Sequence, residues 1–255
     1  MKKLSLGLAA VALAASLTGC VRMHSETDIK ADGSGTASLE IGLSQSVADA
    51  IKEMQEINPE AGGDQELPDF ADINRDNIDK VAKQYGVKVL KFEKSDADGR
   101  MAVSMSFAFD DLKGLSAVMA AAMGEDPEQG MGIYATGDGN YVLKQATYAF
   151  PDFPALDKPA KKEKAEGETP AEMTPEQMQK QMELMGKLMG AMSELDVSLK
   201  ITVPGDIITT NAPTQEGRTS IWTINSSNMM TAGSDMDPVI TFSGKGVKIK
   251  NALTE

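Results

Sequence analysis

The chain has 255 residues, with 25 Lys and Arg, 38 Asp and Glu, one His and one Cys. A single histidine and a single cysteine exclude multi-His metal sites, intrachain disulfides and CxxC redox pairs. Nucleic acid is an unsuitable partner, because a chain with a net charge of −13 and no basic run would gain no binding free energy from the release of counterions. The sequence also has no P-loop, HExxH, GxSxG or dinucleotide-binding motif. We therefore expect a protein that is not an enzyme and has no metal site and no cofactor.

The first twenty residues have the three-part form of an export signal. Lys2 and Lys3 precede an apolar stretch over 4–17, which is shorter than the roughly 20 residues that span a bilayer. The stretch closes on Leu17-Thr18-Gly19-Cys20, which resembles the bacterial lipobox. The resemblance implies that residues 1–19 are a lipoprotein signal peptide. It also implies diacylglycerol on the sulfur of Cys20 and a further acyl chain, such as palmitate, on its new amino group.

Membrane attachment would depend on these acyl chains. Removal of residues 1–19 leaves 23 basic and 38 acidic side chains, a net charge of −15, which anionic lipid does not attract. No later segment approaches about 20 apolar residues. Val21 is not the Asp that commonly retains such proteins at the inner membrane. The expected location is the cell envelope, at the outer membrane facing the periplasm if the host has two membranes.

The predicted elements begin directly after Cys20. Residues alternate between apolar and polar over 21–31 and 37–43 around Asp32-Gly33-Ser34-Gly35, which predicts a hairpin. The first strand would then bring the folded body against the bilayer. Helical spacing follows over 46–57 and 78–85, with a surface loop at 58–72 between them. Further patterns predict a hairpin of 87–94 and 101–109, a helix over 111–123 and a third hairpin over 134–150.

The second half begins with a change of composition. Residues 151–173 are rich in Pro, Lys and Glu and predict a mobile loop. Thr174-Pro175-Glu176-Gln177 has the form of a capping box and starts a helix that is expected to run to 195. Strands are predicted near 197–203, 207–210, 218–224, 239–242 and 247–250. The order indicates an α+β fold with a largely antiparallel sheet built from hairpins, with packed helices.

We interpret residues 20–255 as one α+β lipoprotein domain, because the first hairpin and the last strands can close one sheet. The alternative is two subdomains, 20–150 and 174–255.

Two regions resemble a known family. The first region is Val21-Arg22-Met23, which follows the lipobox and leads into a strand and the turn at 32–35. The second region lies near the C-terminal end and contains residues 201–207, Thr210-Asn211-Ala212 and 219–222. These segments are similar to LppM-like bacterial lipoproteins. The resemblance implies an α+β envelope lipoprotein without assigned catalysis. The chain departs from the family in having no C-terminal transmembrane helix and in having a Met-rich helix.

The Met-rich helix carries the most distinctive internal pattern. Its methionines are separated by 4, 3, 4 and 3 residues and form one face, namely Met178, Met182, Met185, Met189 and Met192. This face is core, or it accepts an apolar ligand or a partner helix, or its thioethers bind Cu(I). Copper is the weakest of the three, because the chain has 17 methionines throughout and His24 is far away in sequence.

Two functional hypotheses follow. In the first, the sheet and the Met-rich helix form an apolar groove that holds a lipid or other hydrophobic ligand near the membrane. In the second, the protein is a structural or assembly lipoprotein that docks on a partner protein through the Met-rich helix.

Overall fold

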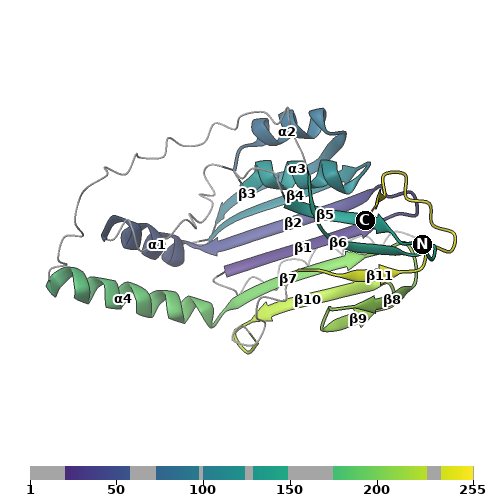
Figure 1. The fold of residues 1–255 in the computed structure, drawn as a ribbon. Coiled ribbons are helices and arrows are strands. Elements are labelled where there is room, and N and C mark those ends of the chain that lie inside the picture. Colours follow the sequence, from purple (N-terminus) through teal and green to yellow (C-terminus); the bar gives the residue numbers. More distant parts are fainter. Residues whose placement is uncertain are drawn as a thin grey trace, which may run out of the picture.

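The computed structural model describes residues 21–57, 73–97, 100–123, 129–148, 175–228 and 237–254. These residues form an α+β fold, as the sequence predicts (Figure 1). The strands make two sheets and not the single sheet expected, because the last two strands of the chain pair in a sheet that does not contain the first hairpin. The large sheet contains, in spatial order, β3 (Val87–Ala97), β4 (Arg100–Phe109), β2 (Gly35–Ser44), β1 (Val21–Ile29), β7 (Leu195–Thr202), β10 (Thr219–Asn225) and β9 (Thr214–Glu216). The small sheet contains β12 (Leu253–Thr254), β5 (Gln129–Ala135), β6 (Tyr141–Thr147), β11 (Ile240–Phe242) and β8 (Ile207–Thr210). The helices are α1 (Gln45–Ile57), α2 (Arg75–Gln84), α3 (Leu112–Met123) and α4 (Pro175–Met192).

The first hairpin forms as predicted. β1 and β2 pair antiparallel over their full length, from Val21 opposite Leu43 to Ile29 opposite Gly35. The turn between them contains Gly33 with φ of 92°, a conformation that favours glycine. The first strand therefore begins at Val21, directly after Cys20, although Cys20 and the predicted signal at 1–19 lie outside the described residues.

One parallel pairing joins the two halves of the chain. β1 lies beside β7 from Val21 opposite Leu195 to Asp28 opposite Thr202. The other strand pairs are antiparallel except β12 with β5, so the predicted largely antiparallel sheet is confirmed.

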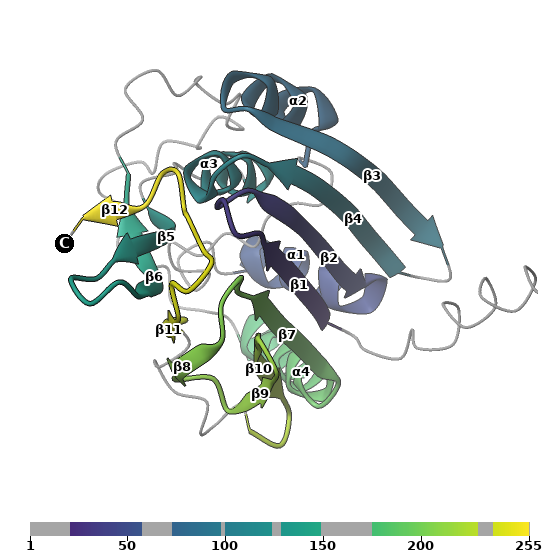
Figure 2. The same ribbon diagram turned by 90° about the vertical axis from the view of Figure 1, so that its right-hand side faces the viewer.

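The core lies on one face of the large sheet. Figure 2 shows this sheet as an arc, with α3 and the small sheet on its inner side. Alternate residues of β2 and β4 point inward and are buried, among them Leu39, Val103, Met105 and Phe107. Trp222 of β10 lies in the same core and is 2% exposed. Period-2 burial of this kind leaves the outer face of each strand for polar residues.

Several element boundaries differ from the sequence prediction. The expected strand at 247–250 is wrong, because Gly246 has φ of 75° and Val247 N–H donates to the Gly244 carbonyl in a turn. The helix expected to run to 195 ends at Met192, since the following two residues form a tight turn onto Gly190 and Ala191. The short strands β9 and β12 were not predicted. The predicted loops at 58–72 and about 151–173 lie outside the described residues.

None of the helices that the structure describes has the length and apolar character needed to cross a membrane.

Candidate ligand-binding cavity

A cavity of about 540 Å³ lies between the inner face of the large sheet and α3. Its floor is formed by the central parts of three adjacent strands, β2, β1 and β7. Ser25 and Thr27 come from β1, Ala37 from β2, and Leu199 and Ile201 from β7. These residues lie in two neighbouring rows across the sheet, because Ser25 is opposite Leu39 and Leu199, and Thr27 is opposite Ala37 and Ile201.

The small side chains that β1 contributes to the floor explain why the cavity is there. In the flanking strands the same rows contain large side chains, Phe107 and Met105 in β4 and Trp222 in β10. In β1 the corresponding positions hold only Ser25 and Thr27. Protein interiors are normally packed without voids, so small residues in the middle of a row of large ones leave space unless another element fills it.

The wall opposite the floor is one side of α3. Leu115, Met119 and Met123 line the cavity at spacings of four residues, which place them on one face of the helix. The helix begins where Asp111 accepts a hydrogen bond from Gly114 N–H at 2.7 Å, as expected of an N-terminal cap. Its remaining faces are buried through Ala117, Val118 and other apolar residues, so the wall is fixed in the core rather than free to move away.

A further wall of the cavity is formed by β5. Gln129, Gly130 and Met131 line it, and Gln145 of β6 donates an amide hydrogen bond to Gln129 at 2.7 Å. Gly130 lies against α3, and a Cβ at this position would overlap the side chain of Ser116. The lining is therefore mostly apolar, with hydroxyl groups on the floor and the amide of Gln129 on the β5 side.

The structure places the predicted Met-rich face elsewhere. Met178, Met182, Met185 and Met189 are 46%, 71%, 48% and 67% exposed, and none of the α4 side chains that the structure describes lines the cavity. The side chain of Met192 lies outside the described part of the chain. The four described methionines are therefore not part of the core. The expected groove between the sheet and the Met-rich helix is wrong, because the helix that forms the cavity with the sheet is α3.

Sequence reasoning missed the cavity residues. The period-2 pattern correctly predicts that residues 21, 23, 25, 27 and 29 share one face. The available signal was that two of them, Ser25 and Thr27, are small and hydroxylated at positions where a strand facing a core normally has large apolar residues.

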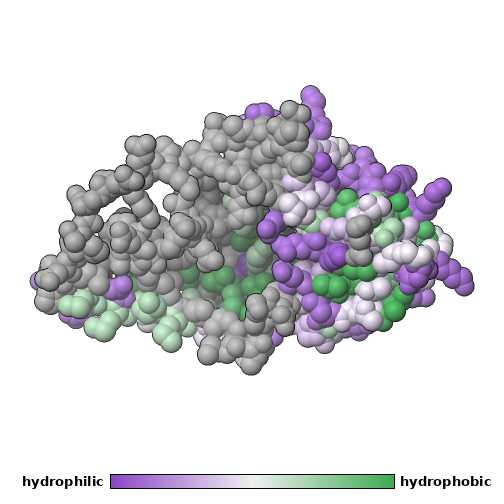
Figure 3. Space-filling model, viewed as in Figure 1, coloured by the Kyte–Doolittle hydropathy of each residue, from purple (hydrophilic) through white to green (hydrophobic). Residues whose placement is uncertain are grey.

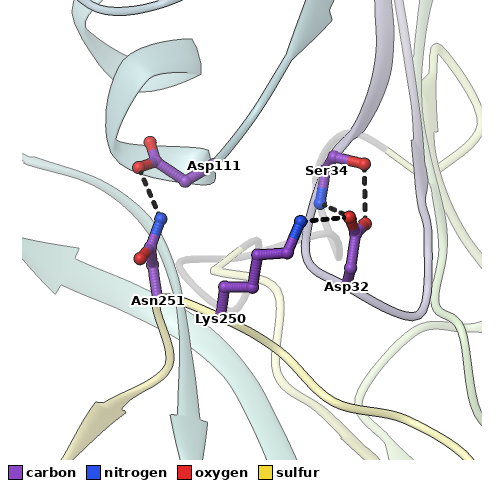
Figure 4. A network of polar contacts seen from close by, with 5 residues as sticks. All are labelled: Asp32, Ser34, Asp111, Lys250 and Asn251. Carbon is purple, nitrogen blue, oxygen red and sulfur yellow. Dashed lines mark hydrogen bonds and ion pairs between the residues drawn. The ribbon is translucent and has the colours of Figure 1, made fainter.

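A second cavity, of about 320 Å³, lies where the C-terminal segment crosses the first hairpin turn. Here Lys250 contacts Asp32 at 2.8 Å, Asp32 also accepts from the hydroxyl and the N–H of Ser34, and Asn251 donates to Asp111 (Figure 4). Hydrogen bonds from Lys250 and Ser34 hold the pKa of Asp32 well below its usual value. These contacts attach the C-terminal segment to the hairpin.

Tyr148 also lines this second cavity. Its hydroxyl donates to the Met131 carbonyl at 2.7 Å, and burial raises the pKa of the phenol above its ordinary value. Around both cavities, and elsewhere in the described residues, no cluster of three His, Cys, Asp or Glu side chains is placed to hold a metal ion.

Comparison with known proteins gives little further information. No protein-family model matches the chain, and no curated protein sequence matches it significantly. An NMR structure of the folded domain of the LppM protein of Mycobacterium tuberculosis is similar over 88% of this chain and 90% of that one, with a TM-score of 0.40 and 13% sequence identity. A TM-score this low does not establish a shared fold.

Proposed function

We propose that this protein is a lipid-anchored, non-catalytic protein of the cell envelope that binds the acyl chain of a lipid in the 540 Å³ cavity. The observation that carries the proposal is the apolar space between α3 and the small residues of β1. Cavities that bind small molecules are typically about 300–1,000 Å³, mostly apolar, with a few polar groups that orient the ligand. The cavity has this size and composition.

An acyl chain fits the chemistry of the lining. Leu115, Met119 and Met123 offer flexible apolar contacts, and burying each methylene contributes about 0.8 kcal/mol. Ser25, Thr27 and Gln129 also line the cavity and supply hydroxyl and amide groups that can hydrogen-bond to the polar end of the lipid. Methionine suits a ligand of variable length, since its side chain is unbranched and adaptable.

The anchoring part of the proposal rests on the sequence. Leu17-Thr18-Gly19-Cys20 matches the bacterial lipobox, and β1 begins at the next residue. Acylation of Cys20 would hold the cavity within one domain's width of the membrane from which its ligand comes. An outer-membrane location, facing the periplasm, is proposed for a host with two membranes.

Native mass spectrometry of the full chain, gently extracted from membranes, tests the binding function. We expect a noncovalent lipid on the wild-type protein and loss of it in Thr27→Phe, which fills the floor. The matched control is Thr36→Phe, because Thr36 is an exposed threonine of the same hairpin on the outer face of the sheet. The affinity for the lipid should fall at least about tenfold in Thr27→Phe, equivalent to about 1.4 kcal/mol, and stay unchanged in the control.

A second variant covers the case in which Thr27→Phe does not fold. Met123→Trp fills the cavity from the helical wall and should give the same loss. Equal lipid occupancy in the wild type and both filled variants would contradict binding in this cavity.

The exposed methionines of α4 support a second role, at a surface separate from the cavity. Cu(I) binding by the same face stays a prediction. Anaerobic titration against a chelator tests it, and competition no better than that of a Met-to-Leu variant of α4 would refute it.

A further inference from the structure

The exposed methionines of α4 form a continuous stripe. At about 100° per residue, Met178, Met182, Met185 and Met189 lie within an arc of about 60° around the helix. Each is between 46% and 71% exposed. In Figure 3, pale hydrophobic atoms lie along the lower left of the molecule, where Figure 1 draws α4. We call these four residues the Met stripe.

The stripe points away from the body of the protein. α4 packs on α1, and Leu184 and Ala191, which are 1% and 6% exposed, lie on the side of α4 distant from the stripe. Lys180 on that side also makes an ion pair with Glu53 of α1 at 3.3 Å. The helix is thus held by its Leu184 side, and its Met stripe faces away from the other elements that the structure describes.

The position of α4 indicates which surface. β7 begins at Leu195, directly after the two-residue turn that ends α4, and Leu195 pairs with Val21. Val21 also pairs with Leu43, which lies just before α1. Figure 1 shows both helices at the end of the large sheet where β1 begins. The start of β1 at Val21, the residue that follows Cys20 in the sequence, therefore lies at the same end as the Met stripe.

The charge of α4 is also compatible with a lipid surface. The helix contains two Lys and two Glu, so it is neutral in a chain with a net charge of −13. Lys187 pairs with Glu183 at 3.1 Å on the side away from the stripe. Contact with lipid would therefore depend on burial of the thioether side chains and would change little with salt.

We propose that the Met stripe lies in the membrane interface beside the acylated Cys20. The inference rests on the acyl anchor of the proposed function but not on the cavity. An interfacial helix buries its apolar face about 5–10 Å into the boundary between headgroups and acyl chains. The anchor keeps α4 at a high effective concentration at the bilayer, so a weak helix interaction is sufficient. Together they fix the orientation of the body on the membrane.

Depth-dependent quenching tests this on the full lipidated chain. Acylation makes the sulfur of Cys20 a thioether, so a cysteine introduced in α4 becomes the only thiol. Met185→Cys and the control Lys187→Cys each receive an environment-sensitive fluorophore and are reconstituted in phosphatidylcholine vesicles with a shallow doxyl-labelled lipid. Met185 and Lys187 are about equally exposed but lie on opposite sides of the helix. We expect several-fold stronger quenching at 185 than at 187.

The other outcomes are separable. Equal quenching at both positions, in protein that floats with the vesicles, overturns the inference and leaves the anchor intact. If the difference in quenching between positions 185 and 187 disappears when the protein is diluted in excess lipid, a second copy of the chain covers the stripe. That result also overturns the inference. Protein that does not float with vesicles, and whose wild type is labelled at Cys20, refutes the anchor and the inference with it.

Discussion

At the scale of single residues, Asp32 shows how one contact attaches the C-terminal segment to the first hairpin. Lys250 and Ser34 stabilise its carboxylate, and two backbone hydrogen bonds, from Lys248 to Ala31 and from Lys250 to Asp32, accompany them. The folded pKa of Asp32 lies below the value of about 3.9 in an unfolded chain, so this carboxylate stabilises the fold at neutral pH.

We predict that Asp32→Asn lowers the melting temperature at pH 7. The difference from wild type should be complete above about pH 5 and shrink as the pH falls below about 4, because protonation of Asp32 then favours the unfolded state. Thermal unfolding at several pH values checks this, with Asp28→Asn, an exposed aspartate of the same hairpin, as the control. A difference that stays constant down to pH 2 would refute the role of the Asp32 carboxylate.

Residue patterns predict the turn at 32–35 but not its partner. Lys250 is more than 200 residues away, and a charge pair at that separation has no local signature. The same limit applies to the cavity, because the alternation of residues 21–29 shows which of them share a face but not that α3 lies above Ser25 and Thr27.

At the scale of elements, α4 has one buried side and one exposed side. We predict that Leu184→Ala lowers the free energy of unfolding by about 2–5 kcal/mol, the usual cost of removing a large buried side chain. Met182→Ala on the opposite side should change it by less than about 0.5 kcal/mol. Urea unfolding of both variants measures this. Similar losses in the two would mean that the Met stripe is buried within the protein.

Most elements could be predicted because their periodicity is local. The alternation of β2 and β4 and the capping box of α4 each predict an element at its observed place. The three-residue β9 and two-residue β12 are too short to show a period, and the glycines around residue 246 break the expected last strand. The 4-3 spacing of Met178 to Met189 correctly predicts one helical face, but spacing alone does not say what covers it.

At the scale of the whole molecule, the parallel pairing of β1 with β7 joins residues before and after the predicted loop at 151–173 in one sheet. If residues 20–255 are one domain, unfolding should be a single cooperative transition. Differential scanning calorimetry of the full chain checks this, and two resolved transitions would support the alternative of two subdomains.

The same pairing brings the start of β1, α1 and α4 to one end of the large sheet, and the cavity lies farther along the same sheet. Under the two proposals, this end faces the membrane and the apolar site is separate from it. The two proposals are independent in their residues, since no Met-stripe residue lines the cavity.

Photocrosslinking with a diazirine fatty acid tests the central proposal most directly. One equivalent is added to purified, delipidated full chain in the absence of vesicles, and the modified peptides are located by mass spectrometry. We predict crosslinks to α3 at Met119 and Met123 and to β5 at Met131, which line the cavity, and loss of these crosslinks in Thr27→Phe. Crosslinks confined to α4, or unchanged in Thr27→Phe, would contradict lipid binding in the cavity.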